Sequence, residues 1–182
     1  MEYIKEPTGN GILRIVEIAI PDHLAFQLVF RQHRLNIFDV ELPGQLKFSL
    51  VGNCWAALSG FSKLLNIFGP FGAIKALLKV MFGRKFYFIH ETGVVLHTGW
   101  MMSSWCRYYR VEPGDVVIGP IWSAVSARGQ GIGALGTQMA INAMMRQGHS
   151  VFFIDTSNNN VACLKMISKC DWKLPIATYL RD

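Results

Sequence analysis

The glycine-rich segment 128–133, with the sequence RGQGIG, has the residue types and the spacing of a loop that binds phosphate. Because glycine lacks a Cβ atom, several backbone N–H groups can converge there on one anion, and the dipole of a following helix favours the same negative charge. Arg128 adds a cation beside this position. The segment therefore predicts a binding site for the phosphates of a nucleotide or a coenzyme.

Two phosphate-binding patterns overlap in this part of the chain. The residues from Arg128 onward match R-x-x-G-x-G, whereas Gly131–Gly136 match G-x-G-x-x-G, the pattern of dinucleotide-binding loops. Asp155 supports the second pattern, because it follows at about the 20-residue spacing of a carboxylate that binds the ribose of NAD. Against it, that pattern usually opens a large parallel sheet, whereas here a predicted hairpin precedes the loop. It also gives Arg128 no role, so a dinucleotide-binding oxidoreductase fragment is the least favoured alternative.

Composition narrows the class of protein. The chain has 182 residues, of which 51% are hydrophobic and 16% charged, as expected for one compact domain. The net charge of +6 favours an anionic ligand or surface, such as a coenzyme, an acidic sugar or an anionic membrane. The N-terminal sequence MEYIKEPTGN lacks the features of an export signal, so we expect a cytoplasmic protein. No metal site is expected, because no C-x-x-C pair occurs among Cys54, Cys106, Cys163 and Cys170.

The second half of the chain has a clear pattern of elements. Segments 85–90 and 94–102 are rich in aromatic and β-branched residues, and the turn-forming Glu91-Thr92-Gly93 between them predicts a β-hairpin. Segment 115–125 predicts a further strand, in which Gly119-Pro120 should cause a bulge or a break in pairing. After the glycine-rich segment we expect a helix over about 133–146, a strand over 149–156 and a helix over 161–169.

Fewer helices and strands can be predicted in the first half of the sequence. Segments 12–20 and 44–52 read as strands, and a helix is expected from about Asp22. Apolar residues at helical spacing predict two helices, over 61–68 and 74–81, separated by Gly69-Pro70-Phe71-Gly72. We expect the large apolar residues of both helices, Leu78 among them, to face the sheet and to border an acceptor site. The less favoured alternative is contact with a membrane surface through the nearby cations Lys75, Lys79, Arg84 and Lys85.

The glycine-rich segment and the residues after it together resemble the GCN5-related N-acetyltransferase (GNAT) superfamily. The acetyl-coenzyme A (acetyl-CoA) loop of that family, Q/R-x-x-G-x-G/A, is matched by residues 128–133, and FFIDTSNNNVACLKMISKCDW (152–172) is similar to the strand, asparagine and short helix that follow it. The resemblance covers residues 85–172. It implies an α/β (α+β) fold, with a mixed, mostly antiparallel sheet that is flanked by helices and splayed at its fourth strand.

By this resemblance residues 1–182 form a single GNAT-like domain, with an N-terminal part (1–84) that carries the helix pair and a coenzyme-binding part (85–182). The implied activity is an N-acetyltransferase that moves an acetyl group from acetyl-CoA, its co-substrate, to a small-molecule amine, for which an aminosugar or nucleotide sugar is one candidate. No nucleic-acid partner is expected, and a homodimer stays open. The implied coenzyme-binding residues are Ile121, Trp122, Ser123, Arg128, Gly129, Gln130, Gly131, Ile132, Gly133, Ala134 and Asn160. Asn160 could equally be an ordinary helix N-cap.

The sequence departs from the family pattern close to the reaction. The tyrosine that many members use as general acid falls on Ile167, the glycine that usually follows the last helix is Asp171, and the proline before the loop is Val125. Protonation of the departing thiolate then falls to another group or to water. A non-catalytic module that binds CoA, a partner or a membrane is therefore the main alternative function.

Two residues are candidates for the base that takes a proton from the amine. His97 has an unperturbed pKa close to neutrality, and Glu91 lies at the predicted hairpin turn. Both could instead be ordinary structural residues. Aromatic residues before Gly119 predict a cleft for the acceptor, because aromatic faces stack on sugar rings or bases; they are Trp100, Trp105, Tyr108 and Tyr109.

Overall fold

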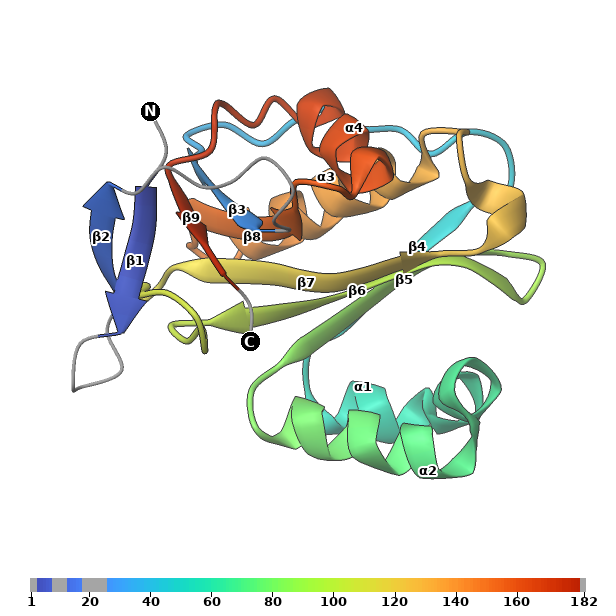
Figure 1. Cartoon of the computed structure of the whole chain (residues 1–182). Coiled ribbons are helices and arrows are strands. Elements are labelled where there is room, and N and C mark those ends of the chain that lie inside the picture. Colours follow the sequence, from blue (N-terminus) through green and yellow to red (C-terminus); the bar gives the residue numbers. More distant parts are fainter. Residues whose placement is uncertain (1–2, 8–12, 18–25, 181–182) are drawn as a thin grey trace.

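The computed structural model describes residues 3–7, 13–17 and 26–180, and one sheet runs through this part of the chain. Its strand order is β2-β1-β9-β3-β8-β7-β6-β5-β4 (Figure 1). Neighbouring strands are antiparallel except in the pairs β1–β9 and β7–β8, which are parallel. The strands are β1 (Tyr3–Pro7), β2 (Leu13–Glu17), β3 (Gln27–His33), β4 (Lys47–Val51), β5 (Lys85–Glu91), β6 (Val94–Ser103), β7 (Val116–Ser123), β8 (Val151–Ser157) and β9 (Ala177–Tyr179).

Helices cover both faces of the sheet (Figure 1). On one face lie α3 (Ile132–Met145) and α4 (Val161–Lys169), and on the other lie α1 (Cys54–Ser59) and α2 (Phe61–Met81). Strand β5 is buried on both sides, because Phe86 and Phe88 contact the layer of α1 and α2 while Tyr87 faces α3. This two-sided burial explains why the strand is almost continuously apolar. The expected class, a mixed and mostly antiparallel sheet flanked by helices, is confirmed.

Strands β7 and β8 diverge where Gly119-Pro120 interrupts β7. They pair only over Val116–Ile118 and Phe152–Ile154. On its other side β7 stays paired with β6, but Gly119 and Pro120 lie opposite the single residue Trp100, which is the arrangement of a β-bulge. Both the predicted bulge and the predicted splay are therefore present, and among the described residues no strand pairs with the β8 side of β7 beyond Ile118.

Most elements expected from residue 44 onward are confirmed: β4, the β5–β6 hairpin, β7, α3, β8 and α4. Segment 12–20 contains β2, and the rest of that segment lies outside the described residues. The helix expected from about Asp22 would begin among residues that are not described, and Gln27–His33 forms a strand instead. Pairing with β8 and β9 on its two sides holds this segment extended, a long-range contact that no local pattern reveals.

The helix pair differs from the prediction in one important respect. A positive φ of 69° at Gly69 breaks α2 into two helical parts, as predicted. Its first part packs large residues on the sheet as predicted, with Leu64 buried and the ring of Phe68 5.0 Å from the ring of Phe86. In its second part Ala73, Ala76 and Val80 are buried, whereas Leu78 is exposed. The prediction that Leu78 is buried is therefore wrong. The physical reason is that the second part of α2 is apolar on two sides, so the spacing of its large residues does not fix which side meets the aromatic rings of β5 and β6.

Candidate active site

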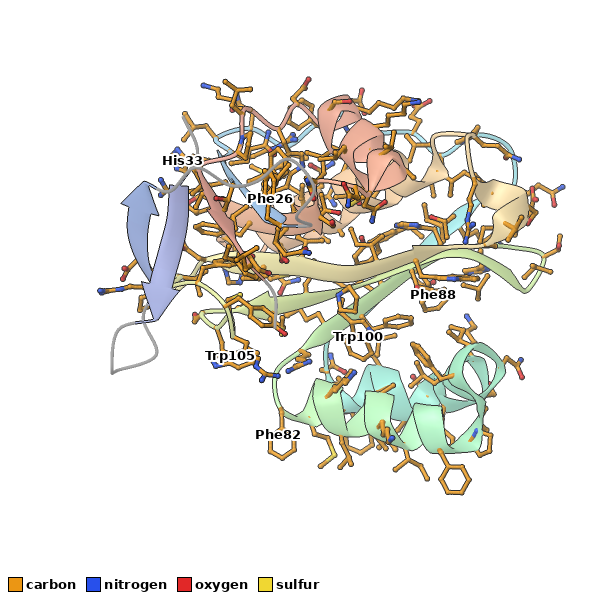
Figure 2. The ribbon with its side chains drawn as sticks, in the orientation of Figure 1. Phe26, His33, Phe82, Phe88, Trp100 and Trp105 are labelled. Carbon is orange, nitrogen blue, oxygen red and sulfur yellow. The ribbon has the colours of Figure 1, made fainter. Side chains whose placement is uncertain are left out.

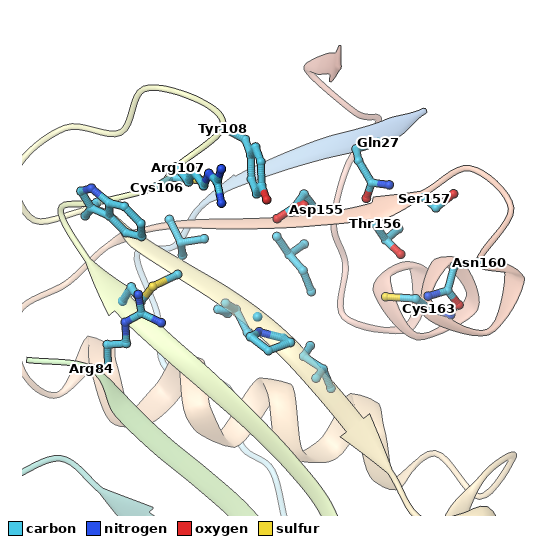
Figure 3. A pocket seen from close by; sticks show the side chains of 18 residues that line it. Gln27, Arg84, Cys106, Arg107, Tyr108, Asp155, Thr156, Ser157, Asn160 and Cys163 are labelled. Atoms are coloured by element: carbon cyan, nitrogen blue, oxygen red, sulfur yellow. Dashed lines mark hydrogen bonds between the residues drawn. The ribbon is translucent and has the colours of Figure 1, made fainter. Parts of the chain in front are cut away.

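A cavity of about 480 Å³ opens where β7 and β8 diverge (Figure 3). One wall is formed by Val117–Ile121 of β7 and the opposite wall by Ile154–Ser157 of β8. Asn160 and Cys163, at the start of α4, close one side. Residues 105–108 of the loop between β6 and β7 close another. The bulge that ends strand pairing is thus also the feature that creates the cavity.

The loop between β6 and β7 is held against the sheet by aromatic contacts. The ring of Tyr108 stacks on Tyr179 of β9 at 5.3 Å, and Tyr109 lies 5.7 Å from Phe153 of β8. Trp105 and Tyr108 line the cavity, as predicted for an acceptor cleft. Tyr109 is buried beneath them and Trp100 packs against α2, so these two contribute to the core and not to the cavity.

Asp155 is the acidic side chain among the residues that line the cavity. It lies on β8, on the face away from α3, and its two carboxylate oxygens accept hydrogen bonds from the hydroxyls of Tyr179 (2.7 Å) and Tyr109 (3.3 Å). Burial raises the pKa of Tyr109, and the neighbouring carboxylate of Asp155 raises it further, so this phenol stays a hydrogen-bond donor. A carboxylate has about four acceptor positions, which leaves capacity for a donor in the cavity.

In the sequence Asp155 supports only the least favoured NAD pattern, and no role in acyl transfer is predicted for it. A signal for its position did exist, because Asp155 alternates with the buried Ile154 and Thr156 on β8 and so faces the opposite side of the sheet. The alternation gives the face of the sheet, but only tertiary packing brings the two tyrosines to it.

Two arginines give the cavity a cationic side. Arg84, between α2 and β5, lies over the ring of Trp105 at 5.7 Å, and Arg107 lies over Tyr108 at 5.6 Å. Both arginines line the cavity (Figure 3). The cavity therefore combines one carboxylate, two guanidinium groups and an aromatic wall. Such a set of groups suits a ligand that carries both an amine and a negative charge.

The glycine-rich loop lies at the N-terminus of α3, as predicted. Gly129 and Gly131 have positive φ values of 79° and 80°, which residues with a side chain rarely adopt, and a Cβ atom at either position would meet no other atom within 4 Å. Glycine is required here by the backbone conformation and leaves open space above the loop. Arg128 is exposed, and its Nε donates to the carbonyl oxygen of Ser123 at 3.3 Å. The first-turn N–H groups of α3 have no partner within the helix and are available to an anion.

The other coenzyme residues predicted on β7 and α4 are placed differently from one another. Ile121 lines the cavity, whereas Trp122 is exposed and Ser123 turns its hydroxyl to His97. Asn160 lines the cavity and also caps α4, because its side chain accepts a hydrogen bond from the Cys163 N–H at 3.1 Å. The expected coenzyme contact and the ordinary capping role are thus compatible.

Of the two candidate bases, neither lines the cavity. Glu91 is exposed at the β5–β6 turn. His97 is fully buried between the sheet and α3, where its Nδ1 lies 2.8 Å from the Ser123 hydroxyl and its Nε2 has no partner among the described residues. Burial lowers the pKa of His97 to about 4, so its ring is neutral at pH 7. This position gives His97 a packing role beneath the loop.

Position 167 offers no acid to the reaction. Ile167 is buried in the core between the sheet and α4, in the cluster that contains Cys170 and Trp172.

Cys163, one turn earlier on α4, lines the cavity, and burial raises the pKa of its thiol. In the described part of the chain no three His, Cys, Asp or Glu side chains lie close enough together to hold a metal ion.

Comparison with known proteins gives matches among solved structures only: no family model and no curated protein matches the sequence. A GNAT-family acetyltransferase from Colwellia psychrerythraea aligns with 19% identity and a TM-score of 0.59, over 85% of this chain and 54% of that chain. A GCN5-related N-acetyltransferase from Sphaerobacter thermophilus aligns with 12% identity and a TM-score of 0.58, over 82% and 48%.

An aminoglycoside N-acetyltransferase solved in complex with CoA aligns with 12% identity and a TM-score of 0.55, over 74% of this chain and 93% of that chain. The chain spans about half the length of the first two matched structures, 54% and 55%. At these identities the likeness concerns the fold. With β7 and β8 parallel and diverging beside a glycine loop that opens α3, the chain has the fold of the GNAT superfamily.

Proposed function

We propose that this protein is an N-acetyltransferase that uses acetyl-CoA as co-substrate. The observation that carries the proposal is the cavity between the diverging strands β7 and β8, with the glycine loop of α3 at the adjoining end of β7. Because no strand of the described residues pairs with the β8 side of β7 beyond Ile118, its backbone could pair there with the amide groups of pantetheine, as an added strand would. The loop 128–133 then receives the pyrophosphate, where Arg128 and the helix dipole favour its charge.

The transfer itself requires little acid catalysis. The neutral amine attacks the carbonyl carbon of the thioester, the bond from that carbon to sulfur breaks, and CoA leaves as a thiolate while the nitrogen gives up one proton. A thiol has a pKa near ~8.5, so its thiolate leaves without prior protonation and takes a proton from water afterwards. An apolar residue at position 167 is therefore compatible with turnover. Backbone N–H groups near Ile121 would stabilise the oxyanion that forms in between.

Asp155 is the base and the anchor for the amine in this proposal. It is the carboxylate among the lining residues, and the hydroxyls of Tyr109 and Tyr179 hold it in place. Glu91 and His97 stay predictions for this role, and their positions away from the cavity do not favour them. An amine bound to Asp155 would lie beside Ile154–Ser157, on the β8 wall of the cavity.

The acceptor proposed here is a small amine that also carries an anionic group. Arg84 and Arg107 would bind the anionic group, and the rings of Trp105 and Tyr108 would cover the remainder. An aminosugar attached to a phosphate is one acceptor of this type, and an amino acid is another.

The test is release of free CoA thiol from acetyl-CoA in the presence of amines, together with thermal shift. We expect acetyl-CoA, and not NADH, to stabilise the protein, and amines with an anionic group to be acetylated faster than the same amines without one. Stabilisation without turnover on any amine would support the non-catalytic CoA-binding module, which the apolar Ile167 favours. No stabilisation by acetyl-CoA would refute the proposal.

A further inference from the structure

Large apolar side chains cover the side of α1 and α2 that faces away from the sheet. We call this surface the outer face; in Figure 2 the ring of Phe82 points away from the sheet, whereas Phe88 and Trp100 lie between the sheet and the helices. Phe71 is 82% exposed and Phe82 is 84% exposed. The outer face consists of Trp55, Leu58, Phe71, Ile74, Leu78, Met81 and Phe82.

Helix α2 is thus apolar on two opposite sides. Its inner side packs on the sheet, with Leu64, Ala73 and Ala76 fully buried. Its outer side carries the stripe Phe71, Ile74, Leu78 and Phe82, at the spacing of one helix face. A single exposed apolar residue is ordinary, but a contiguous patch of this kind marks a site of interaction with a protein or a membrane.

Charge decides which partner fits the outer face. Residues 42–90 contain no Asp or Glu, and their cations are Lys47, Lys63, Lys75, Lys79, Arg84 and Lys85. At 100° per residue, Lys75 lies along one edge of the apolar stripe of α2. Lys79 lies farther round the helix, where its Nζ is 5.0 Å from the ring of Trp100 on β6. Apolar and aromatic side chains bordered by cations are complementary to a surface that is hydrophobic within and negative at its edge.

A second copy of this chain fits the outer face poorly. In a two-fold dimer the same patch meets itself, so Lys75 would enter the equally cationic patch of the second copy. No acidic residue between positions 42 and 90 is available to pair with it. An anionic lipid surface has no such conflict, because aromatic and aliphatic side chains enter the interfacial layer while lysines contact the headgroups.

We propose that the outer face of α1 and α2 docks the protein on the surface of an anionic membrane. The helix lies in the plane of the interface in this arrangement. By length and composition α2 could cross a membrane, but its inner side is part of the core against β5 and β6, and Gly69 breaks it in the middle. Docking keeps that core intact. It is independent of the proposed acetyl transfer and is measured without it.

The test is flotation of the purified protein with vesicles of phosphatidylcholine alone and of phosphatidylcholine with 30% phosphatidylglycerol. We expect binding to the anionic vesicles at physiological salt and little binding to the neutral ones. Phe71→Asp and Phe82→Asp, at exposed positions, should each lower binding at least ten-fold while the melting temperature stays unchanged. The matched control is Leu174→Asp, which makes a similar change at a residue that is 85% exposed and lies beyond α4; it should bind like the wild type.

The contribution of charge is tested separately. Lys75→Gln should weaken binding to the anionic vesicles about five-fold, the effect of one cation near such a surface. The proposal is overturned if the wild type does not float with anionic vesicles, or if Phe71→Asp and Phe82→Asp bind as the wild type does. It is also overturned if sedimentation shows a dimer that both aspartate variants dissociate, because a second copy would then cover the outer face.

Discussion

The carboxylate of Asp155 is the residue on which the proposed chemistry depends most. Both of its oxygens already accept phenol hydrogen bonds, so Asp155→Asn changes charge and basicity with little change in shape. Loss of a base typically lowers rates by about 10²–10⁴-fold, and we expect kcat/KM to fall by at least ~10²-fold with unchanged acetyl-CoA binding. Steady-state kinetics and thermal shift with acetyl-CoA measure the two effects.

Two variants serve as controls for Asp155→Asn. Tyr179→Phe keeps the carboxylate and removes one hydrogen bond, so it should retain most of the activity. Asp39→Asn makes the same change at an exposed position between β3 and β4 and should behave as the wild type. An Asp155→Asn enzyme with normal kcat/KM would show that the base lies elsewhere.

His97 predicts a pH dependence of stability. Its pKa is lowered by burial to about 4 in the folded protein, against 6.5 when exposed, so between these values the unfolded chain binds more protons. The contribution of the neutral, buried ring to the free energy of unfolding is therefore fully present above pH 6.5, and it is lost as pH falls towards 4. This shift in the pKa of His97 corresponds to about 3 kcal/mol of the free energy of unfolding.

Urea unfolding at pH 7 and at pH 4.5 tests this prediction. The free energy of unfolding of the wild type should be lower at pH 4.5 than at pH 7. His97→Gln should make this difference smaller, whatever the stability of the variant at pH 7. An equal difference in both proteins would mean that His97 does not carry the dependence.

At the scale of elements, the loop before α3 is predicted to hold the pyrophosphate. Gly131→Glu places bulk and negative charge at the left-handed residue that caps α3. At a hundred-fold excess over its Kd, acetyl-CoA should stabilise the wild type by about 2.7 kcal/mol and this variant not at all. Gly131→Gln is the matched control for backbone strain, and it should keep part of the shift. Full stabilisation of Gly131→Glu would refute the loop assignment.

The packing of α3 on the sheet depends on a second glycine of the same helix. A Cβ atom at Gly136 would lie 2.5 Å from the ring of His97, whereas at Gly133 it would lie 3.6 Å away, an ordinary contact. Gly136→Ala should therefore destabilise the protein by about 1–3 kcal/mol, the usual cost of overpacking. Gly133→Ala should be neutral or stabilising, because alanine favours the helix. Equal melting temperatures for the two variants would contradict this account.

At the scale of the whole molecule, the net charge of +6 should attract the polyanionic coenzyme. The distance over which charges are felt falls from about 30 Å at 0.01 M salt to about 8 Å at 0.15 M. We expect the Kd for acetyl-CoA to rise several-fold over this range. Acetyl-pantetheine, which lacks the phosphates, is the control, and its affinity should not change. Salt-independent binding of acetyl-CoA would exclude long-range attraction.

The sequence by itself determined most of the second half of the fold and the position of the coenzyme loop. Local rules suffice there. Glycines with positive φ at 129 and 131, the turn at Gly93 and the break at Gly119-Pro120 act within a few residues of the chain. The order of strands in the part before residue 44 could not be predicted in the same way, because β3 is held by β8 and β9 from the far end of the sequence.

Only the tertiary structure decided which groups meet in the cavity and which sides of the helices are covered. Asp155, Tyr109 and Tyr179 come from three separate segments, so no spacing links them. The side chain of His97 has the chemistry of a general base, but it is packed under α3, because Gly136 leaves room for its ring. Leu78 belongs to an apolar stripe that faces away from the sheet, whereas Ala73, Ala76 and Val80 on the other side of the same helix are buried against it. Periodicity identifies an apolar face, but where a helix is apolar on two sides only tertiary packing determines which side is buried.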